Sequence, residues 1–180
     1  GVLPGVSPAG GRRAASTAGM IDGDVGTETP MRFTIATYNI HKGFTQLNRR
    51  MVIHELRDRL VGLDPDILFL QEVAGDNARH AARHLDWPVK PQHEFIAGSV
   101  WQEVAYGKNA VYRHGHHGNA VLSRFPIVTH ENQDISAHPF ESRGLLHCEI
   151  QVVDQRPALH CINVHLGLFE RGRQWQLRAL

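Results

Sequence analysis

Cysteine and long apolar segments are both scarce in this sequence. Only two of the 180 residues are cysteines, Cys148 and Cys161, and they have neither the paired spacing of a zinc motif nor the density of a disulfide-stabilised fold. No apolar run approaches the ~20 residues that cross a bilayer, and the N-terminal segment lacks the apolar centre of a secretory signal. We therefore expect buried, reduced thiols in a cytoplasmic protein.

An excess of charge of one sign is also missing. Nineteen Lys and Arg residues stand against 18 Asp and Glu residues, which gives a formal net charge of +1. There is thus no polybasic signature of nucleic-acid binding, and an anion must be held by local groups. Histidine is abundant, with 13 residues. At neutral pH these histidines are mainly potential ligands and acid–base groups, because imidazole titrates near pH ~6.5.

Several catalytic motifs are absent as well. The sequence contains no Gly-x-Ser-x-Gly elbow, no Walker loop, no dinucleotide-binding fingerprint and no His-Glu-x-x-His. The common nucleophilic, nucleotide-binding and zinc-peptidase functions therefore have no support. Metal-assisted chemistry and binding remain.

The composition, with 42% hydrophobic and 21% charged residues, fits one globular domain. Residues 1–30 are rich in Gly, Ala, Ser, Thr and Pro and lack any periodicity, so they cannot bury enough apolar surface to offset the entropy of ordering. We expect a disordered leader or an upstream extension there, because the sequence does not begin with methionine and Met31 opens the first convincing strand. The working domain is then residues 31–180.

The pattern of apolar residues predicts a strand–helix–strand opening followed by short strands. Residues 32–40 form the first strand, Asn48 is the N-cap of a helix through about Val61, and residues 67–70 form a strand covered on both faces. A short helix is expected at 77–85 and another at 170–180. Turn residues separate the remaining strands, which favours antiparallel pairing. These strands are predicted at 106–112, 119–123, 127–135, 144–153 and 158–164.

Polar side chains stand at or near the ends of several predicted strands. A carboxylate surrounded by amides is a hard-oxygen set, which suits Mg²⁺ or Mn²⁺ and disfavours a zinc site of nitrogen and sulfur. The alternative is structural: Glu72 as the polar end of a strand, asparagines that bond turn backbone, and a satisfied core histidine at 165. The residues concerned are Asn39, Glu72, Asn119, Asn163 and His165.

Two further groups have open interpretations. Arg143, next to Gly144, can hold a phosphate in its planar fork, or it can form a surface ion pair with Glu141. The dense histidines His114, His116 and His117 suggest zinc binding, but the segment also has the pattern of a hairpin turn.

Five ordered motifs resemble the endonuclease/exonuclease/phosphatase superfamily, which includes pancreatic deoxyribonuclease, abasic-site endonucleases, bacterial sphingomyelinases and inositol polyphosphate 5-phosphatases. The resemblance covers residues 32–180 and is nearest to bacterial members of unassigned substrate. The motifs are Thr37-Tyr-Asn-Ile40, Leu70-Gln-Glu-Val73, Gly118-Asn-Ala-Val-Leu-Ser-Arg-Phe-Pro-Ile127, Arg143-Gly-Leu-Leu146 and Asn163-Val-His-Leu166.

The resemblance implies an α/β fold, a four-layer sandwich of two packed mixed or antiparallel sheets with outer helices. It implies Glu72 as the Mg²⁺ ligand, with Asn39 beside it holding metal or phosphate. His165 would lie near the scissile phosphate and Asn119 would line the site. Arg143 matches a position that can contact phosphate, and Asn163 is a further candidate for substrate binding.

The sequence departs from the family pattern in its second half. A Gly-Asp-x-Asn motif and a terminal Ser-Asp-His, whose Asp–His pair activates the attacking water, are both missing. We therefore expect the N-terminal portion of a longer domain. An alternative is a non-catalytic fragment or binding module.

The function expected from the resemblance is Mg²⁺-dependent hydrolysis of a phosphoester by in-line attack of water, with a diester favoured over a monoester. A nucleic acid, a phospholipid head group and a soluble phosphoester all remain open as substrates. We expect a monomer.

Overall fold

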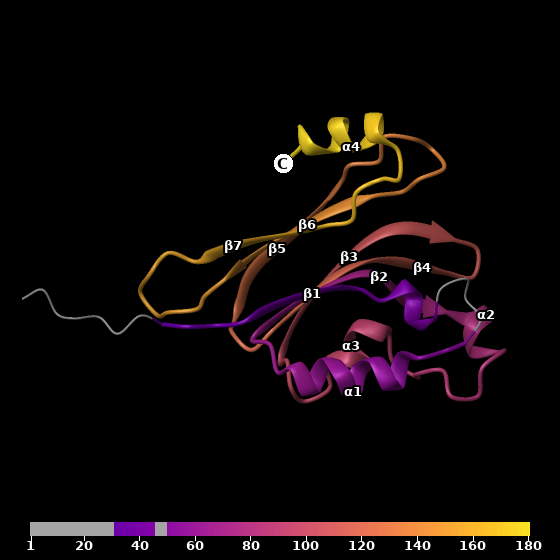
Figure 1. Cartoon of the computed structure of the whole chain (residues 1–180), viewed down its shortest axis with the longest axis horizontal. Helices are drawn as coiled ribbons and strands as arrows, with labels where there is room; N and C mark the ends of the chain where they lie inside the picture. Colours follow the sequence, from indigo (N-terminus) through magenta and orange to yellow (C-terminus); the bar gives the residue numbers. More distant parts are fainter. Residues whose placement is uncertain (1–30, 46–49) are drawn as a thin grey trace, which may run out of the picture. The chain divides into compact units, whose positions relative to one another are not determined.

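Seven strands form two sheets in the computed structural model, which describes residues 31–45 and 50–180. The first sheet has four strands in the order β1-β2-β4-β3, and the second has three in the order β5-β6-β7 (Figure 1). The strands are β1 Ile35–Asn39, β2 Ile67–Asn77, β3 Glu103–Tyr112, β4 Gly115–Ser123, β5 Ile127–Asp134, β6 Gly144–Ile150 and β7 Leu159–Val164.

The helices connect and cover these strands. Strands β1 and β2 pair in parallel, and α1 lies between them in the sequence, which confirms the predicted strand–helix–strand unit. Ile53, Leu56 and Leu60 bury one face of α1 because their spacing places them on one side of a helix. The helices are the 3₁₀-helix η1 His41–Gly43 and the α-helices α1 Ile53–Leu63, α2 Ala78–Ala81, α3 Gln92–Ala97 and α4 Glu170–Leu177.

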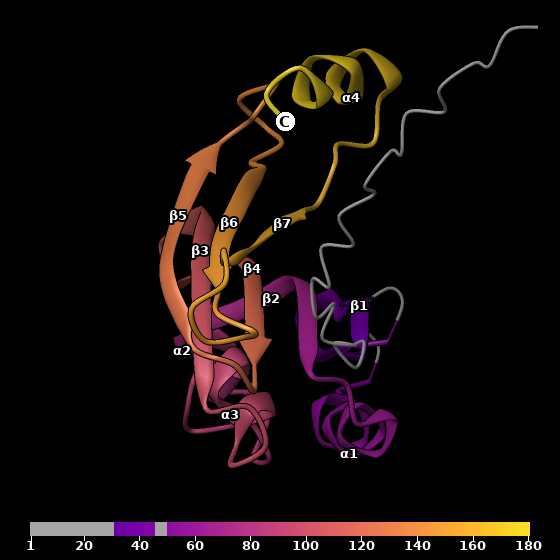
Figure 2. The same ribbon diagram turned by 90° about the vertical axis from the view of Figure 1, so that its left-hand side faces the viewer.

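Two hydrophobic cores lie on opposite faces of the four-stranded sheet. Alternate residues of β2 pack into one core or the other, because successive side chains of a strand point to opposite faces of the sheet. Leu68 and Leu70 pack with α1 and α3, whereas Ile67 packs in a second cluster with Leu146 and Cys148 of β6. Figures 1 and 2 show α1 and α3 on one side of this sheet and β5–β7 on the other. The predicted α/β fold of packed sheets with helices is confirmed.

The three-stranded sheet is buried mainly on one face, although Leu145 of β6, on the opposite face, is also buried. Leu146, Cys148 and Ile150 of β6 face the core between the sheets and are fully buried. Ile162 of β7 is 43% exposed. Helix α4 lies close to one end of this sheet in both views (Figures 1 and 2).

Several element boundaries differ from the sequence predictions. The strand expected at 67–70 continues to Asn77, and the helix expected at 77–85 is confined to Ala78–Ala81. Helix α1 ends at Leu63, one residue beyond Gly62, and Asp64 takes the left-handed conformation after it. Helix α3 was not predicted, because six residues are too few to show a helical period.

Other boundaries moved by a few residues. Strand β6 ends at Ile150 instead of 153, and α4 ends at Leu177 instead of 180. The predicted N-cap Asn48 and the leader at 1–30 lie outside the described residues. Among the helices that are described, none is long and apolar enough to span a bilayer.

Candidate active site

A β-bulge in β2 positions Glu72. Leu70 pairs with Ala120 and Val73 pairs with Gly118, so Gln71 and Glu72 together oppose the single residue Asn119. The extra residue turns the strand locally, as bulges beside functional sites do. Glu72 has a φ of 52°, a left-handed conformation that a residue with a side chain rarely adopts. The buried neighbours Leu70 and Val73 hold the backbone in place.

The end of β1 brings a second group of side chains to Glu72. Asn39 Nδ2 donates to Glu72 Oε1 at 3.1 Å, and Lys42 Nζ donates to Glu72 Oε2 at 3.0 Å. The backbone N–H of His41 donates to Asn39 Oδ1 at 3.0 Å, which fixes the orientation of the amide. Asn39 therefore presents its donor, and not its oxygen, to the carboxylate.

Backbone strain concentrates at this point. Five non-glycine residues with positive φ occur in the part of the chain that the structure describes, and three of them are His41, Lys42 and Glu72. Each such conformation costs about 1–3 kcal/mol and persists only where surrounding structure enforces it. Strain of this kind clusters at active sites, so its position favours a functional role for the Glu72 region.

The electrostatic environment keeps Glu72 ionised. Burial alone would raise the pKa of Glu72, but the hydrogen bonds from Asn39 and Lys42 and the charge of Lys42 lower it to about 2. Glu72 Oε1 lies 3.9 Å from His165 Nε2. Burial, then the charge of Arg143, lowers the pKa of His165. At neutral pH the site thus pairs a carboxylate with an uncharged imidazole.

His117 belongs to the same cluster, although the sequence analysis assigned it to a turn. The turn is Arg113 and His114, whereas His117 lies within β4. Burial, then the charge of Lys42, lowers the pKa of His117 to about 4, and the charges of Glu72 and Arg143 also act on it. The alternation of side chains along the strand could have predicted this placement, because His117 lies two residues before Asn119 and therefore on the same face of β4.

The zinc alternative for His114, His116 and His117 is wrong. Adjacent residues of a strand point to opposite faces, so His116 hydrogen-bonds Tyr106 at 2.9 Å while His117 contacts Tyr112 at 3.2 Å. In residues 31–45 and 50–180, the one cluster with converging metal-binding atoms lies elsewhere.

Asn119 and Asn163 are buried, and each is 1% exposed. Asn119 Nδ2 donates to the carbonyl of Gly144 at 3.0 Å. Asn163 Nδ2 donates to the carbonyls of Leu70 and Ala120 at 3.0 and 2.8 Å, and its Oδ1 accepts from Gln71 at 2.8 Å. These amides tie the two sheets together beneath Glu72, because their bonds run from β4 to β6 and from β7 to β2 and β4.

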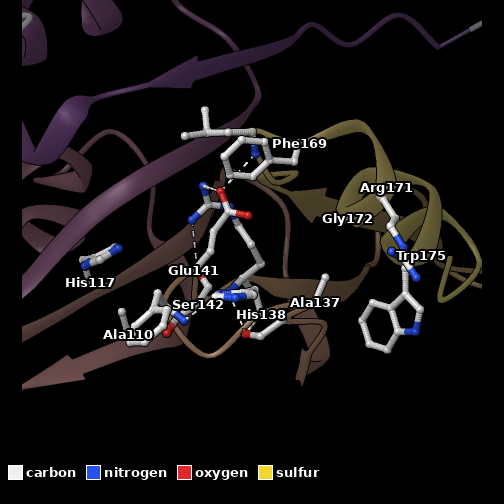
Figure 3. Close-up of a pocket in the computed structure, with 14 residues that line it drawn as sticks. Ala110, His117, Ala137, His138, Glu141, Ser142, Phe169, Arg171, Gly172 and Trp175 are labelled. Atoms are coloured by element: carbon white, nitrogen blue, oxygen red, sulfur yellow. Dashed lines mark hydrogen bonds and ion pairs between the residues drawn. The ribbon is translucent and has the colours of Figure 1, made fainter.

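Arg143 is part of a second arrangement next to this cluster. Its Nη2 lies 3.0 Å from Glu141 Oε1, and its Nε donates to the carbonyl of Leu166 at 3.3 Å. The Arg143–Glu141 ion pair, which was one of the two alternatives for Arg143 in the sequence analysis, is therefore present. Both side chains are less than one-fifth exposed. Both residues and His117 line a cavity of about 1040 Å³. Figure 3 shows Trp175 of α4 on the opposite side of this cavity from His117.

The residues present fit a hard divalent cation. The ionised Glu72 is an oxygen ligand that stays deprotonated over the whole physiological range. Mg²⁺ needs only one or two carboxylates when waters and substrate phosphate oxygens complete its shell. Asn39 Oδ1 is already bonded to the His41 N–H, so Glu72 is the main candidate ligand and Asn39 orients it.

Comparison with known proteins places the chain in a family. Residues 36–179 match the model of the Endonuclease/Exonuclease/phosphatase family. The chain belongs to this family. Membership confirms the resemblance that the five motifs predicted.

The chain is similar to Uncharacterized protein YbhP of Escherichia coli (strain K12). The two are 49% identical over 148 residues, which are 82% of this chain and 58% of the relative. This chain therefore spans less than two thirds of the length of the curated relatives it matches.

Two solved structures show the same fold. An endonuclease/exonuclease/phosphatase from Beutenbergia cavernae has a TM-score of 0.62 and 19% identity over 82% of this chain and 42% of its own. A family protein from Leptotrichia buccalis has a TM-score of 0.61 and 13% identity over 82% of this chain and 61% of its own.

Proposed function

We propose that the protein is a Mg²⁺-dependent phosphoester hydrolase that acts by in-line attack of water, with Mn²⁺ as a possible substitute. The observation that carries the proposal is the ionised Glu72, held at a strained bulge by Asn39 and Lys42 beside a neutral His165. Membership of a family named for endonucleases, exonucleases and phosphatases supports the reaction class.

Each side chain has a distinct role in this proposal. Glu72 would hold the cation, which when bound neutralises charge on a phosphate and polarises its oxygens. Asn39 orients the carboxylate. His165, neutral at pH 7, donates a hydrogen bond to a phosphate or leaving oxygen. Asn119 and Asn163 act as positioning residues, since their amide groups already bond to other strands.

Positive charge for the substrate comes from the edges of the site. Lys42 Nζ forms an ion pair with Glu72. Because its long side chain is flexible, it can exchange this partner for a phosphate oxygen. Arg143 is fixed by Glu141 and by the Leu166 carbonyl, so it would offer a preoriented guanidinium. The net charge of the chain is only +1, which favours a compact phosphodiester over extended duplex binding, since each duplex phosphate normally needs its own Lys or Arg.

A nucleic acid, a phospholipid head group and a soluble phosphoester all fit this chemistry. We further propose, as in the sequence analysis, that the protein is a cytoplasmic monomer. Binding without turnover is the second candidate function, and one contact favours it. The carboxylate beside His165 is that of Glu72, at 3.9 Å. The Asp–His pair seen in the described part of the chain, Asp76 with His116 at 4.0 Å, does not involve His165.

Hydrolysis of bis(p-nitrophenyl) phosphate by the full-length protein tests the proposal. We expect turnover that needs Mg²⁺ and stops with EDTA, and a fall of at least about a hundredfold in Glu72→Gln, as when a key electrostatic group of a site is removed. Glu94→Gln is the matched control, because Glu94 lies exposed on α3. Wild-type turnover by Glu72→Gln at saturating Mg²⁺ would refute the role of Glu72. Substrate binding without any turnover would support the second candidate.

A further inference from the structure

A second cluster of potential ligands lies on β6 and β7, away from the Glu72 site. His147, Glu149 and His160 each offer one ligand atom, and these atoms all lie within 4.8 Å of one another. His147 Nε2 and His160 Nδ1 are 2.9 Å apart. The two rings stack with centroids 5.2 Å apart and planes 9° from parallel. Two imidazole nitrogens and a carboxylate oxygen thus lie close enough together for a single ion to reach all three.

Strand geometry explains why these residues meet. Leu146 and Cys148 face the core between the sheets, so His147 and Glu149 point to the opposite face of β6. Glu149 pairs directly with His160 of β7 in the antiparallel register. Directly opposed residues place their side chains on the same face, with Cβ atoms about 5 Å apart. The cluster is therefore a consequence of the register.

The donor set differs from that at Glu72. Imidazole nitrogens suit Zn²⁺ and related transition metals, whereas Mg²⁺ prefers oxygen ligands. Zinc binds nitrogen at about 2.0–2.1 Å, so two nitrogens on one tetrahedral ion lie roughly 3.3 Å apart. The observed 2.9 Å is a hydrogen bond between the two rings, so an ion would replace its proton and turn both nitrogens toward itself while their separation grows by a few tenths of an ångström. Three protein ligands also leave one position for water.

We propose that His147, Glu149 and His160 bind a Zn²⁺-class transition-metal ion on the outer face of the three-stranded sheet. Glu131 of β5 pairs with His147 in register, so its carboxylate shares this face and adds negative charge beside the site. The ion links β6 to β7. Binding to the folded state alone then stabilises the protein by mass action. The site is independent of the proposed hydrolase function, because it faces away from the inter-sheet core where Asn163 supports Glu72.

Zinc titration of tag-free, metal-stripped protein tests the site. With saturating Mg²⁺ present, ZnCl₂ titrated into the protein in a calorimeter should show one tight site per chain. His147→Gln and His160→Gln should weaken that site at least about tenfold, since even residues that only orient metal ligands cost 10–100-fold when mutated. His114→Gln is the matched control, because His114 is an exposed turn histidine outside the cluster. It should retain wild-type affinity.

Melting temperature gives a second readout that does not depend on activity. Zinc should raise the melting temperature of wild type and of His114→Gln but not of His160→Gln. All three should melt alike in EDTA, because the side chains of His114 and His160 are both exposed. Undiminished zinc affinity in His160→Gln would overturn the proposal. Loss of the tight site in Glu72→Gln, with retention in His160→Gln, would also overturn it by assigning the zinc to the Glu72 site.

Discussion

The two sheets differ in how many of their faces are buried. In the four-stranded sheet, β2 begins with the continuous apolar run Ile67-Leu-Phe-Leu70 and packs against helices on one face and strands on the other. In the three-stranded sheet, β6 alternates apolar and polar residues from Leu146 to Ile150, and its polar side chains, His147 and Glu149, face outward. The doubly buried sheet can hold Glu72 in a strained backbone conformation, because neighbours on both faces restrain it. The singly buried sheet instead has an outer face free for ligands.

The largest expected difference between the sheets is in core packing. Leu122 of β4 is fully buried against α1 and α3, so Leu122→Ala should lower the free energy of unfolding by about 2–5 kcal/mol. Urea denaturation followed by tryptophan fluorescence measures this. A loss below about 1 kcal/mol would show that the helix-covered core contributes little.

The next effect is acid sensitivity at the Glu72 site. The unfolded-state pKa of His117 is near 6.5 and its folded-state pKa is about 4, so the unfolded chain binds the proton first as the pH falls. The stability associated with neutral His117 is therefore complete above pH 6.5 and is lost progressively toward pH 4. The loss is at most about 3 kcal/mol and is reduced by solvent screening, because His117 is only partly buried. Glu72 adds a further loss only below pH 4.5, toward its own pKa of about 2.

His117→Gln isolates the contribution of this histidine. Denaturation curves from pH 7.5 to pH 4 should be less pH-dependent in His117→Gln than in wild type. His138→Gln, at an exposed position on the Ser136–Arg143 side of the cavity, is the control. Identical pH profiles for wild type and His117→Gln would contradict the assignment of His117 to the buried cluster.

The smallest effect is expected on the outer face of the three-stranded sheet. Ile162 of β7 is 43% exposed, so Ile162→Ala should change the free energy of unfolding by about 0.5 kcal/mol or less. The same urea measurement applies. A loss comparable to that of Leu122→Ala would mean that this face is covered in the working protein, and the contrast between the sheets would fail.

The sequence predicted the strands well but not the local geometry of the site. The motifs around Asn39, Glu72 and His165 identified side chains that do converge, because strand ends at one edge of a sheet meet. The bulge at Glu72 was not foreseeable, since one extra residue in a strand leaves no mark in an apolar pattern. Lys42 follows the first strand without any spacing that assigns it a partner, and its contact with Glu72 depends on the left-handed turn at His41 and Lys42.

The partners of the buried amide side chains also could not be predicted from the sequence. Asn119 and Asn163 stand in the predicted motifs, but a sequence does not tell whether an amide faces an open site or the carbonyls of neighbouring strands. The structure shows bonds to backbone in both cases. Their predicted roles in catalysis and substrate binding stay predictions, and positioning is the role the bonds support.

Mn²⁺ binding followed by electron paramagnetic resonance tests whether Glu72 is a ligand for a hard divalent cation. Titrating Mn²⁺ into wild-type protein should reduce the signal of the free ion, and Mg²⁺ should restore it by competition. Glu72→Gln should weaken Mn²⁺ binding at least about tenfold, while Glu94→Gln should bind as wild type does. Equal Mn²⁺ affinity in Glu72→Gln and wild type would show that the carboxylate at the bulge holds no metal.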